Sequence, residues 1–186
     1  VRRLVGSEMC IRDRLGTDQI GRDILSRLIF ASRNTLGICF LACTIALFIG
    51  TIFGIIAAID RSYIDQILSR SIDTLMAIPV MIFTFILLSV FGPSNLNLIL
   101  ILGVLESTRF FRISRSVAVG QVVLEYVEVA KLRGEKLSYI IFREILPNIA
   151  SPLIVEFGVR FIFIIFTVSS LSFLGLGIQP PAADWA

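Results

Sequence analysis

The stretch EYVEVAKLRGEKLSYIIFREILPN, residues 125–148, decides the fold, because it is the one long amphipathic segment and uniformly apolar runs lie on both sides of it. Its first charges, Glu125, Glu128 and Lys131, recur every three residues, which places them on one face of a helix. The pattern predicts two short helices that lie along a membrane surface and present a charged face to something outside the bilayer.

Two positions divide this segment. Gly134 interrupts the first amphipathic run, where a residue with positive φ would end one helix and turn into the next. The second run, 137–145, ends at Leu146-Pro147-Asn148, where we expect the next membrane span to begin.

Composition indicates an integral membrane protein. The chain has 186 residues, of which 56% are hydrophobic, and a mean hydropathy of +0.90, which is too apolar for a soluble domain of this length. The net charge is only +3, and the arginines are scattered among apolar runs, so no basic face suited to nucleic acid is expected.

The cysteines do not indicate a metal site. Cys39 and Cys43 lie one helical turn apart in an apolar run, so we expect them to pack as small hydrophobic residues rather than to form a disulfide. The sequence has no histidine and no Cys-x-x-Cys spacing, and we predict no metal ligand set.

The first residues differ from the rest. Residues 1–14 are charged, lack an apolar period and contain no signal-peptide core, so we expect a non-native or disordered leader. Residues 15–34 have one apolar stripe, with Thr17 and Asp18 as candidate N-caps, and predict an amphipathic helix at the membrane interface.

Four spans are expected, since a crossing needs about 20 apolar residues. Gly50 and Gly54 have the spacing that permits close helix packing, and Pro79 marks a kink. The expected spans cover about 35–59, 67–91, 96–113 and 149–177.

Two pairs of charged residues fall inside these spans, Glu106 with Arg109 and Glu156 with Arg160. Intramembrane charges are costly and usually face a partner or a water-filled path. Each pair is therefore either an ion pair within one helix near the interface or part of the lining of a substrate path.

Charge counting predicts the orientation. The 92–95 turn has no Lys or Arg, whereas 60–73 and 106–148 contain several, so the positive-inside rule places the latter two on the cytoplasmic side. The arginines at 22, 27 and 33 would then lie outside, because each crossing reverses the side.

Four blocks in order resemble one protein family. They are LGTDQIGRDILSR (15–27), YVEVAKLRG (126–134), FREILPN (142–148) and LSFLGLGIQPP (171–181). They are similar to the second permease subunit of ABC importers for dipeptides, oligopeptides or nickel, and the likeness extends from Leu15 to Ala186. Residues 128–130 with Gly134 and 145–147 resemble the EAA loop of these permeases.

The resemblance implies an all-α integral membrane protein, a MetI-like type I ABC-importer permease helical bundle with about four of about six spans present. The loop, 120–148, would dock on a cytoplasmic ATPase and transmit its motion to the spans. The coupling residues implied are Glu128, Val129, Ala130, Gly134, Ile145, Leu146 and Pro147.

The resemblance also implies partners. These are a second permease subunit, two cytoplasmic ATPase subunits and an extracytoplasmic solute-binding protein, in a bacterial or archaeal plasma membrane. No Gly-x-x-x-x-Gly-Lys-Ser/Thr loop occurs, so ATP and Mg²⁺ would be bound by the partner ATPases and this chain would be a transport subunit rather than an enzyme.

Three residues depart from the family pattern. Val129 replaces an alanine, Glu144 stands where histidine is frequent, and Val168 stands where glutamate is common. The chain also resembles a fragment that lacks the family's first and last spans. The alternatives are an ABC permease for another solute, a secondary transporter or channel, an intramembrane enzyme, and a structural membrane fragment.

Overall fold

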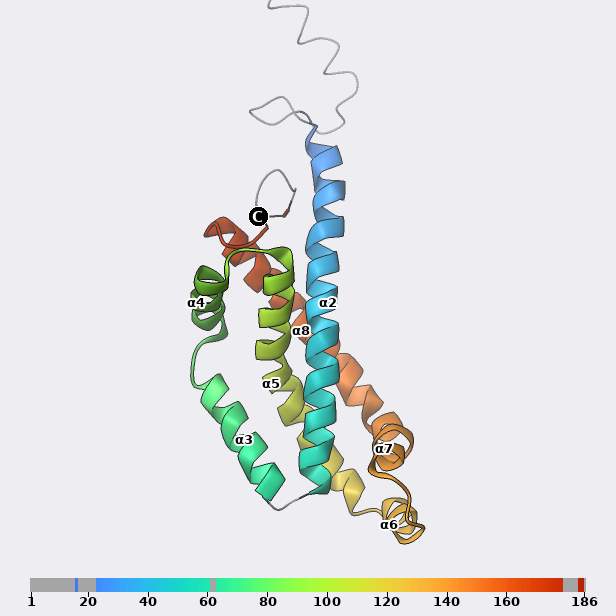
Figure 1. The fold of residues 1–186 in the computed structure, drawn as a ribbon. Helices are drawn as coiled ribbons and strands as arrows, with labels where there is room; N and C mark the ends of the chain where they lie inside the picture. The colour runs from blue at the N-terminus through green and yellow to red at the C-terminus, as the bar shows by residue number, and fades with distance from the viewer. Residues whose placement is uncertain (1–15, 17–22, 61–62, 179–183, 186) are drawn as a thin grey trace, which may run out of the picture.

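The computed structural model describes residue 16 and residues 23–60, 63–178 and 184–185. Its elements over these residues are helices, shown in Figure 1. They are α2 (Ile24–Ile59), α3 (Tyr63–Met76), α4 (Val80–Phe91), α5 (Asn95–Val122), α6 (Glu125–Leu132), α7 (Leu137–Tyr139), the π-helical η1 (Ile140–Ile145) and α8 (Leu146–Phe173). The expected leader, 1–14, and the candidate caps Thr17 and Asp18 lie outside the described residues.

The first helix differs from the prediction. A separate interfacial helix over 15–34 is wrong for its described part, because α2 runs without a break for 36 residues from Ile24 to Ile59. Asp23 caps it, accepting hydrogen bonds from the backbone N–H groups of Leu25 (3.2 Å) and Ser26 (3.1 Å). Its length is about 54 Å at 1.5 Å per residue, so α2 extends well beyond a hydrocarbon core of about 30 Å.

Small residues bring α2 against α5. A Cβ atom at Gly50 would lie 2.5 Å from the Cβ of Phe110, and one at Gly54 would lie 2.8 Å from the carbonyl oxygen of Phe111. Gly103 on α5 meets Ile45 of α2 in the same way, at 2.8 Å from its Cγ2. The predicted close packing at Gly50 and Gly54 is confirmed, and it makes α2 and α5 the central pair of the bundle.

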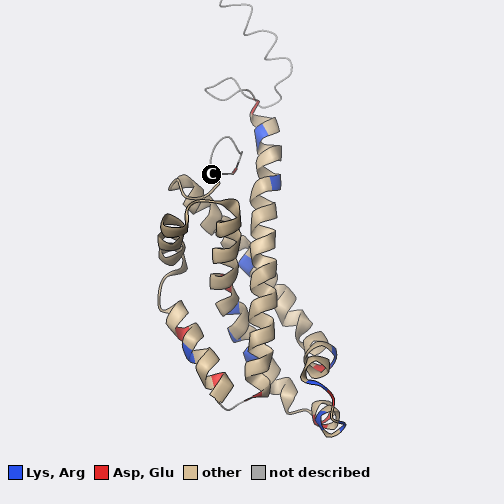
Figure 2. Cartoon of the chain, in the orientation of Figure 1, with Lys and Arg blue, Asp and Glu red and all other residues tan. Residues whose placement is uncertain are grey.

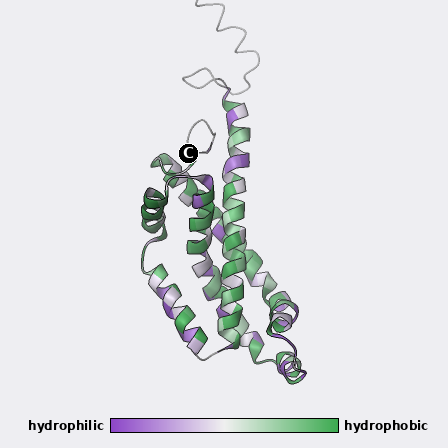
Figure 3. Cartoon of the chain, viewed as in Figure 1, coloured by the Kyte–Doolittle hydropathy of each residue, from purple (hydrophilic) through white to green (hydrophobic). Residues whose placement is uncertain are grey.

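The single span expected over about 67–91 is instead two helices, α3 and α4, bent by 85°. The break coincides with Pro79, which has no N–H to donate and whose ring restricts the residue before it, so α3 ends at Met76 and α4 starts at Val80. The predicted kink is therefore a sharp corner. Figure 3 shows hydrophobic residues along α4, while α3 is mixed.

α5 is longer than the span expected over 96–113. Ser94 caps it by accepting from the N–H of Asn97 at 3.1 Å, and the helix continues to Val122. The span expected over about 149–177 corresponds to α8, which already begins at Leu146 and ends at Phe173.

By length and composition, two described stretches can cross a membrane, α2 and the continuous helical run Leu137–Phe173, or three if α3 and α4 form one bent span. α5 does not meet that measure because it carries Glu106, Arg109 and two further arginines. Four crossings remain a prediction that depends on α5.

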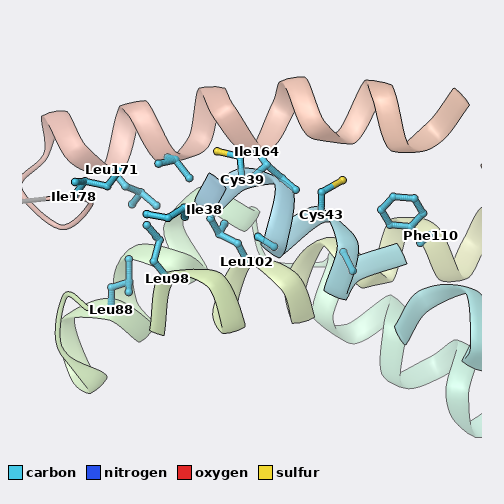
Figure 4. Packing of buried hydrophobic residues seen from close by; sticks show 13 residues of the cluster. Ile38, Cys39, Cys43, Leu88, Leu98, Leu102, Phe110, Ile164, Leu171 and Ile178 are labelled. Carbon is cyan, nitrogen blue, oxygen red and sulfur yellow. The ribbon is translucent and has the colours of Figure 1, made fainter. Parts of the chain in front are cut away.

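The core lies where α2, α4, α5 and α8 meet, as Figure 4 shows. Cys39 and Cys43 are fully buried free thiols in this cluster, which confirms their predicted packing role. A second cluster lies toward the other end, where α2, α5, α6, η1 and α8 converge around Val127 and Ile145.

The chain reverses at opposite ends of the bundle. In Figure 1 the end of α2, the start of α3, α6 and α7 lie at one end, and the α4–α5 turn lies at the other end with the start of α2. Figure 2 shows charged residues concentrated around α6 and α7. The two segments that charge counting assigns to one side therefore lie at the same end.

Candidate functional site

The loop expected to dock on an ATPase, residues 120–148, is called here the candidate coupling segment. Its hairpin consists of α6, the turn at Gly134 and α7, and α6 is the first arm. It ends as predicted at a turn in which Gly134 has a φ of 74°. The N–H of Gly134 donates to the carbonyl oxygen of Lys131 (3.0 Å), and that of Glu135 donates to Ala130 (3.2 Å), which satisfies the last carbonyl groups of the helix. Because no atom lies within 4 Å of a Cβ placed at Gly134, backbone conformation rather than space requires the glycine.

α6 is attached to the bundle by its apolar face. Val127 is fully buried and Ala130 is 5% exposed, and both lie in the cluster that includes Ile140, Ile145 and Ala118. Ala130 is small enough for α6 to lie directly against η1. The inner face of the hairpin is therefore packed against η1 and the adjoining ends of α5 and α8, so the hairpin moves together with these elements.

The second arm differs from the prediction. A short helix that stops at Pro147 is wrong, because α7, η1 and α8 follow one another without a break. Pro147 cannot donate to a carbonyl group one turn back, and the π-helical turn immediately before it accommodates the missing bond. Ile145 is fully buried, Leu146 is half-buried and Pro147 is exposed.

The outer face of the hairpin is open. Glu128, Val129 and Gly134 are exposed, and Leu132 is 81% exposed. Glu128 forms no ion pair within 4 Å among the described residues. Charged and apolar side chains thus alternate on a surface at the end of the bundle, which suits a protein contact better than contact with lipid alone.

Tyr126 connects the hairpin to both neighbouring helices. Its hydroxyl donates to Oε1 of Gln121 (2.7 Å) and accepts from Nδ2 of Asn148 (3.3 Å). Loss of hydration raises the pKa of Tyr126 and outweighs the hydrogen bond from Asn148, so the phenol stays neutral at physiological pH. Glu144, the departure next to Ile145, is half-buried beside a hollow of about 400 Å³ that Tyr126 also lines.

The charged residues inside the helices form one group. Arg160 and Glu156 pair through Nε and Oε1 within α8, which confirms an ion pair within one helix at this position. Glu106 is 6% exposed and its Oε2 has no hydrogen-bond partner. The charged side chains near enough to act on Glu106 are Arg160 and Glu156 of α8 and Arg109 of its own helix.

Arg109 is exposed, and in the described part of the chain it forms no ion pair with Glu106 within 4 Å. The prediction of an ion pair between Glu106 and Arg109 within one helix is therefore wrong. Glu106 is buried, and a role in lining a substrate path stays a prediction. Val168 is 1% exposed in the apolar core, consistent with a residue that needs no polar partner.

Two ion pairs between α3 and α5 were not predicted. Nε and Nη2 of Arg115 donate to the two carboxylate oxygens of Asp65 at 2.5 and 2.6 Å, and Arg112 pairs with Asp73 at 2.7 Å. The residues of these pairs are 50 and 39 positions apart in the chain, and only an expected antiparallel arrangement of the two helices would suggest their pairing. No described residues form a group of three or more His, Cys, Asp or Glu that would suit a metal ion.

Comparison with known proteins identifies the protein family to which the sequence is similar. Residues 50–186 match the family described as "Binding-protein-dependent transport system inner membrane component". This match includes α5, the whole candidate coupling segment and α8.

Curated relatives extend the match toward the N-terminus. The chain is 36% identical over 170 residues to the dipeptide transport system permease protein DppC of Alkalihalophilus pseudofirmus, covering 91% of this chain and 56% of that relative. It is 31% identical to the di/tripeptide transport system permease protein DppC of Pseudomonas aeruginosa, covering 92% and 56%. It is 33% identical to the glutathione transport system permease protein GsiD of Pectobacterium atrosepticum, covering 92% and 57%.

The chain spans little more than half the length of the curated relatives that it matches. The family match nevertheless covers most of the chain, including the segment that organises its fold. The helical architecture, the apolar helices and this match agree, and the chain belongs to the family of binding-protein-dependent transport system inner membrane components.

Proposed function

We propose that the polypeptide that contains this chain is a permease subunit of an ATP-driven importer that carries small peptides across the membrane. The relatives are named for transport of dipeptides, of di- and tripeptides, and of glutathione, which is itself a tripeptide. Small peptides are the substrate class common to these names. Nickel complexes and other solutes remain second candidates that competition in a transport assay distinguishes.

The observation that carries the coupling proposal is the continuity of the helical run Leu137–Phe173. Movement of α7 would pass to α8 through helical backbone, because no loop lies between the two. Val127 and Ala130 attach α6 to the same unit, so the hairpin and α8 respond together. A rigid joint is what rigid-body switching between two states of a transport path requires.

The exposed face around Glu128, Val129 and Leu132 is the proposed contact with a cytoplasmic ATPase. A charged group and apolar groups lie side by side there, which supports a specific protein contact. The proposed assembly contains this permease, a second permease subunit, two ATPase subunits that bind ATP and Mg²⁺, and an extracytoplasmic solute-binding protein.

The proposed location is a bacterial or archaeal plasma membrane, with α6 and α7 on the cytoplasmic side. The end of α2 and the start of α3 lie at the same end as these helices, which supports one orientation for both basic segments. Single cysteines at Lys131 and at Ser94 test it with a membrane-impermeant thiol reagent applied to intact cells. The orientation requires labelling at position 94 and not at 131, and the reverse would overturn it.

Transport by the full-length polypeptide, co-expressed with the neighbouring subunits, tests the function. We expect proteoliposomes to accumulate a radiolabelled dipeptide only when ATP is present at the ATPase side and solute-binding protein at the other. Unlabelled tripeptides would compete, whereas a nickel complex would not. Uptake that is independent of ATP would instead support the alternative of a secondary transporter or channel.

A further inference from the structure

An apolar groove lies between α2 and the first half of α8. Its volume is about 430 Å³, and ten of its twelve lining residues are apolar, the other two being Thr44 and Thr51. On α2 the lining residues run from Phe40 to Ile52, and on the η1–α8 side they run from Phe142 to Phe157. Figure 1 shows α8 crossing behind α2 and continuing away from it toward α7.

The groove covers about one leaflet of a bilayer. The lining on α2 extends for about 18 Å at 1.5 Å per residue, somewhat more than half of a hydrocarbon core of about 30 Å. Phe40 and Phe157 meet edge to face at one end, with ring centroids 5.8 Å apart. Phe142, which belongs to the candidate coupling segment, lies at the other end.

A second hollow adjoins the groove at Phe142. It has a volume of about 520 Å³, and Lys136, Ser138 and Arg143 line it. Glu135 is the one acid in its wall, so two cations face a single carboxylate. Neither Lys136 nor Arg143 forms an ion pair within 4 Å in the described part of the chain. The guanidinium of Arg143 lies over the ring of Tyr139, 5.7 Å from its centroid, and this contact holds it beside the hollow.

We propose that the groove and the hollow together bind one anionic phospholipid. An acyl chain would lie in the groove, and the headgroup phosphate would receive hydrogen bonds from Lys136, Arg143 and Ser138. Basic sites beside membrane helices on the cytoplasmic side bind anionic headgroups in this way. Phe142, common to both walls, marks the boundary between tail and headgroup.

A protein helix fits these features less well. A transmembrane helix needs an apolar surface across the whole bilayer, whereas this groove ends at Phe40 and Phe157. A basic hollow at one end of an apolar groove matches an amphiphile with a negative head. Since Phe142 belongs to η1, the lipid would contact the segment that joins the coupling hairpin to α8.

The test uses the full-length polypeptide in its complex, reconstituted in nanodiscs with phosphatidylglycerol that carries a photoactivatable group on its acyl chain. We expect labelling of the peptide that contains residues 142–157. Replacing both basic residues (Lys136→Gln with Arg143→Gln) should lower the labelling about tenfold or more. The matched control, Lys131→Gln with Arg133→Gln, removes the same charge from residues that line neither cavity and should leave it unchanged.

A second pair of variants tests the groove itself. Ala150→Trp fills it and should abolish labelling, while Val155→Trp, at an exposed α8 position outside the lining, should not. The proposal would be overturned if the Lys136/Arg143 variant and the Lys131/Arg133 control were labelled equally. It would also be overturned if unlabelled phosphatidylcholine displaced the photoactivatable lipid as well as unlabelled phosphatidylglycerol does. It would also be overturned if the wild type were unlabelled while a cysteine at Ala150 crosslinked to another subunit, since a protein helix would then occupy the groove.

Discussion

The hydroxyl of Ser114 on α5 donates a hydrogen bond to the carbonyl oxygen of Gly50 on α2, at 3.1 Å. The bond joins residues 64 positions apart and is fully buried. It forms because the helices approach until a side chain on one reaches the backbone of the other, and only glycine at position 50 permits that distance.

We expect Gly50→Ala to separate α2 from α5. Its Cβ would lie 2.8 Å from the backbone nitrogen of Phe111, which cannot move independently of its helix. The expected cost is about 1–3 kcal/mol. Gly37→Ala, where nothing lies within 4 Å, is the control. Thermal unfolding of the full-length complex in detergent measures both, and equal midpoints would contradict the packing account.

The attachment of α3 to α5 depends on two unequal ion pairs. Arg115 and Asp65 form a two-bond contact with side chains 37% and 17% exposed, whereas Arg112 and Asp73 are 56% and 59% exposed. A double-mutant cycle on the first pair should give a coupling energy of about 1–2 kcal/mol, and a cycle on the second should give under about 1 kcal/mol. Equal coupling energies in the two cycles would contradict the expectation that the less exposed ion pair is the stronger one.

The buried charged residues of α5 and α8 predict that one substitution partly compensates for the loss of stability caused by another. Arg160→Gln removes the ion-pair partner of Glu156 and a cation that acts on the buried Glu106, and should destabilise the protein by about 3–5 kcal/mol. Glu106→Gln alone should cost little, because Oε2 of Glu106 has no hydrogen-bond partner to lose.

In the double variant, Glu106→Gln should restore part of the stability that Arg160→Gln removes. Thermal unfolding in detergent compares the three proteins. Additive losses would mean that Glu106 and Arg160 do not interact across the α5–α8 contact.

The candidate coupling segment shows how much the sequence determines. The spacing of Glu125, Glu128 and Lys131 and the position of Gly134 predict α6 and its turn, because both are local properties. The continuation of α7 into α8 is not predictable in the same way. Pro147 normally favours a break, and the π-helical turn that accommodates it has no clear sequence signal.

Other differences have the same origin. The sequence offers Thr17 and Asp18 as caps, whereas the cap that the structure shows for α2 is Asp23, whose carboxylate accepts from the N–H groups of Leu25 and Ser26. Pro79 marks a break, but the 85° angle depends on what α3 and α4 contact. The position of Glu106 toward Arg160 is set by the α5–α8 contact, which spacing along one helix cannot give.

The central claim is that the hairpin turned at Gly134 couples the bundle to a cytoplasmic ATPase. Gly134→Asp and Gly92→Asp are matched variants: both glycines have positive φ, of 74° and 89°, and neither has an atom within 4 Å of a Cβ. Each should cost on the order of 1–2 kcal/mol in backbone strain. The α4–α5 turn that contains Gly92 lies at the end of the bundle away from α6.

The decisive measurement is retention of the ATPase when the full-length permease is purified from membranes with its neighbouring subunits. We predict that wild type and Gly92→Asp retain the ATPase, and that Gly134→Asp inserts normally but loses most of it. Equal retention by the two variants would contradict the assignment of Gly134 to the coupling turn.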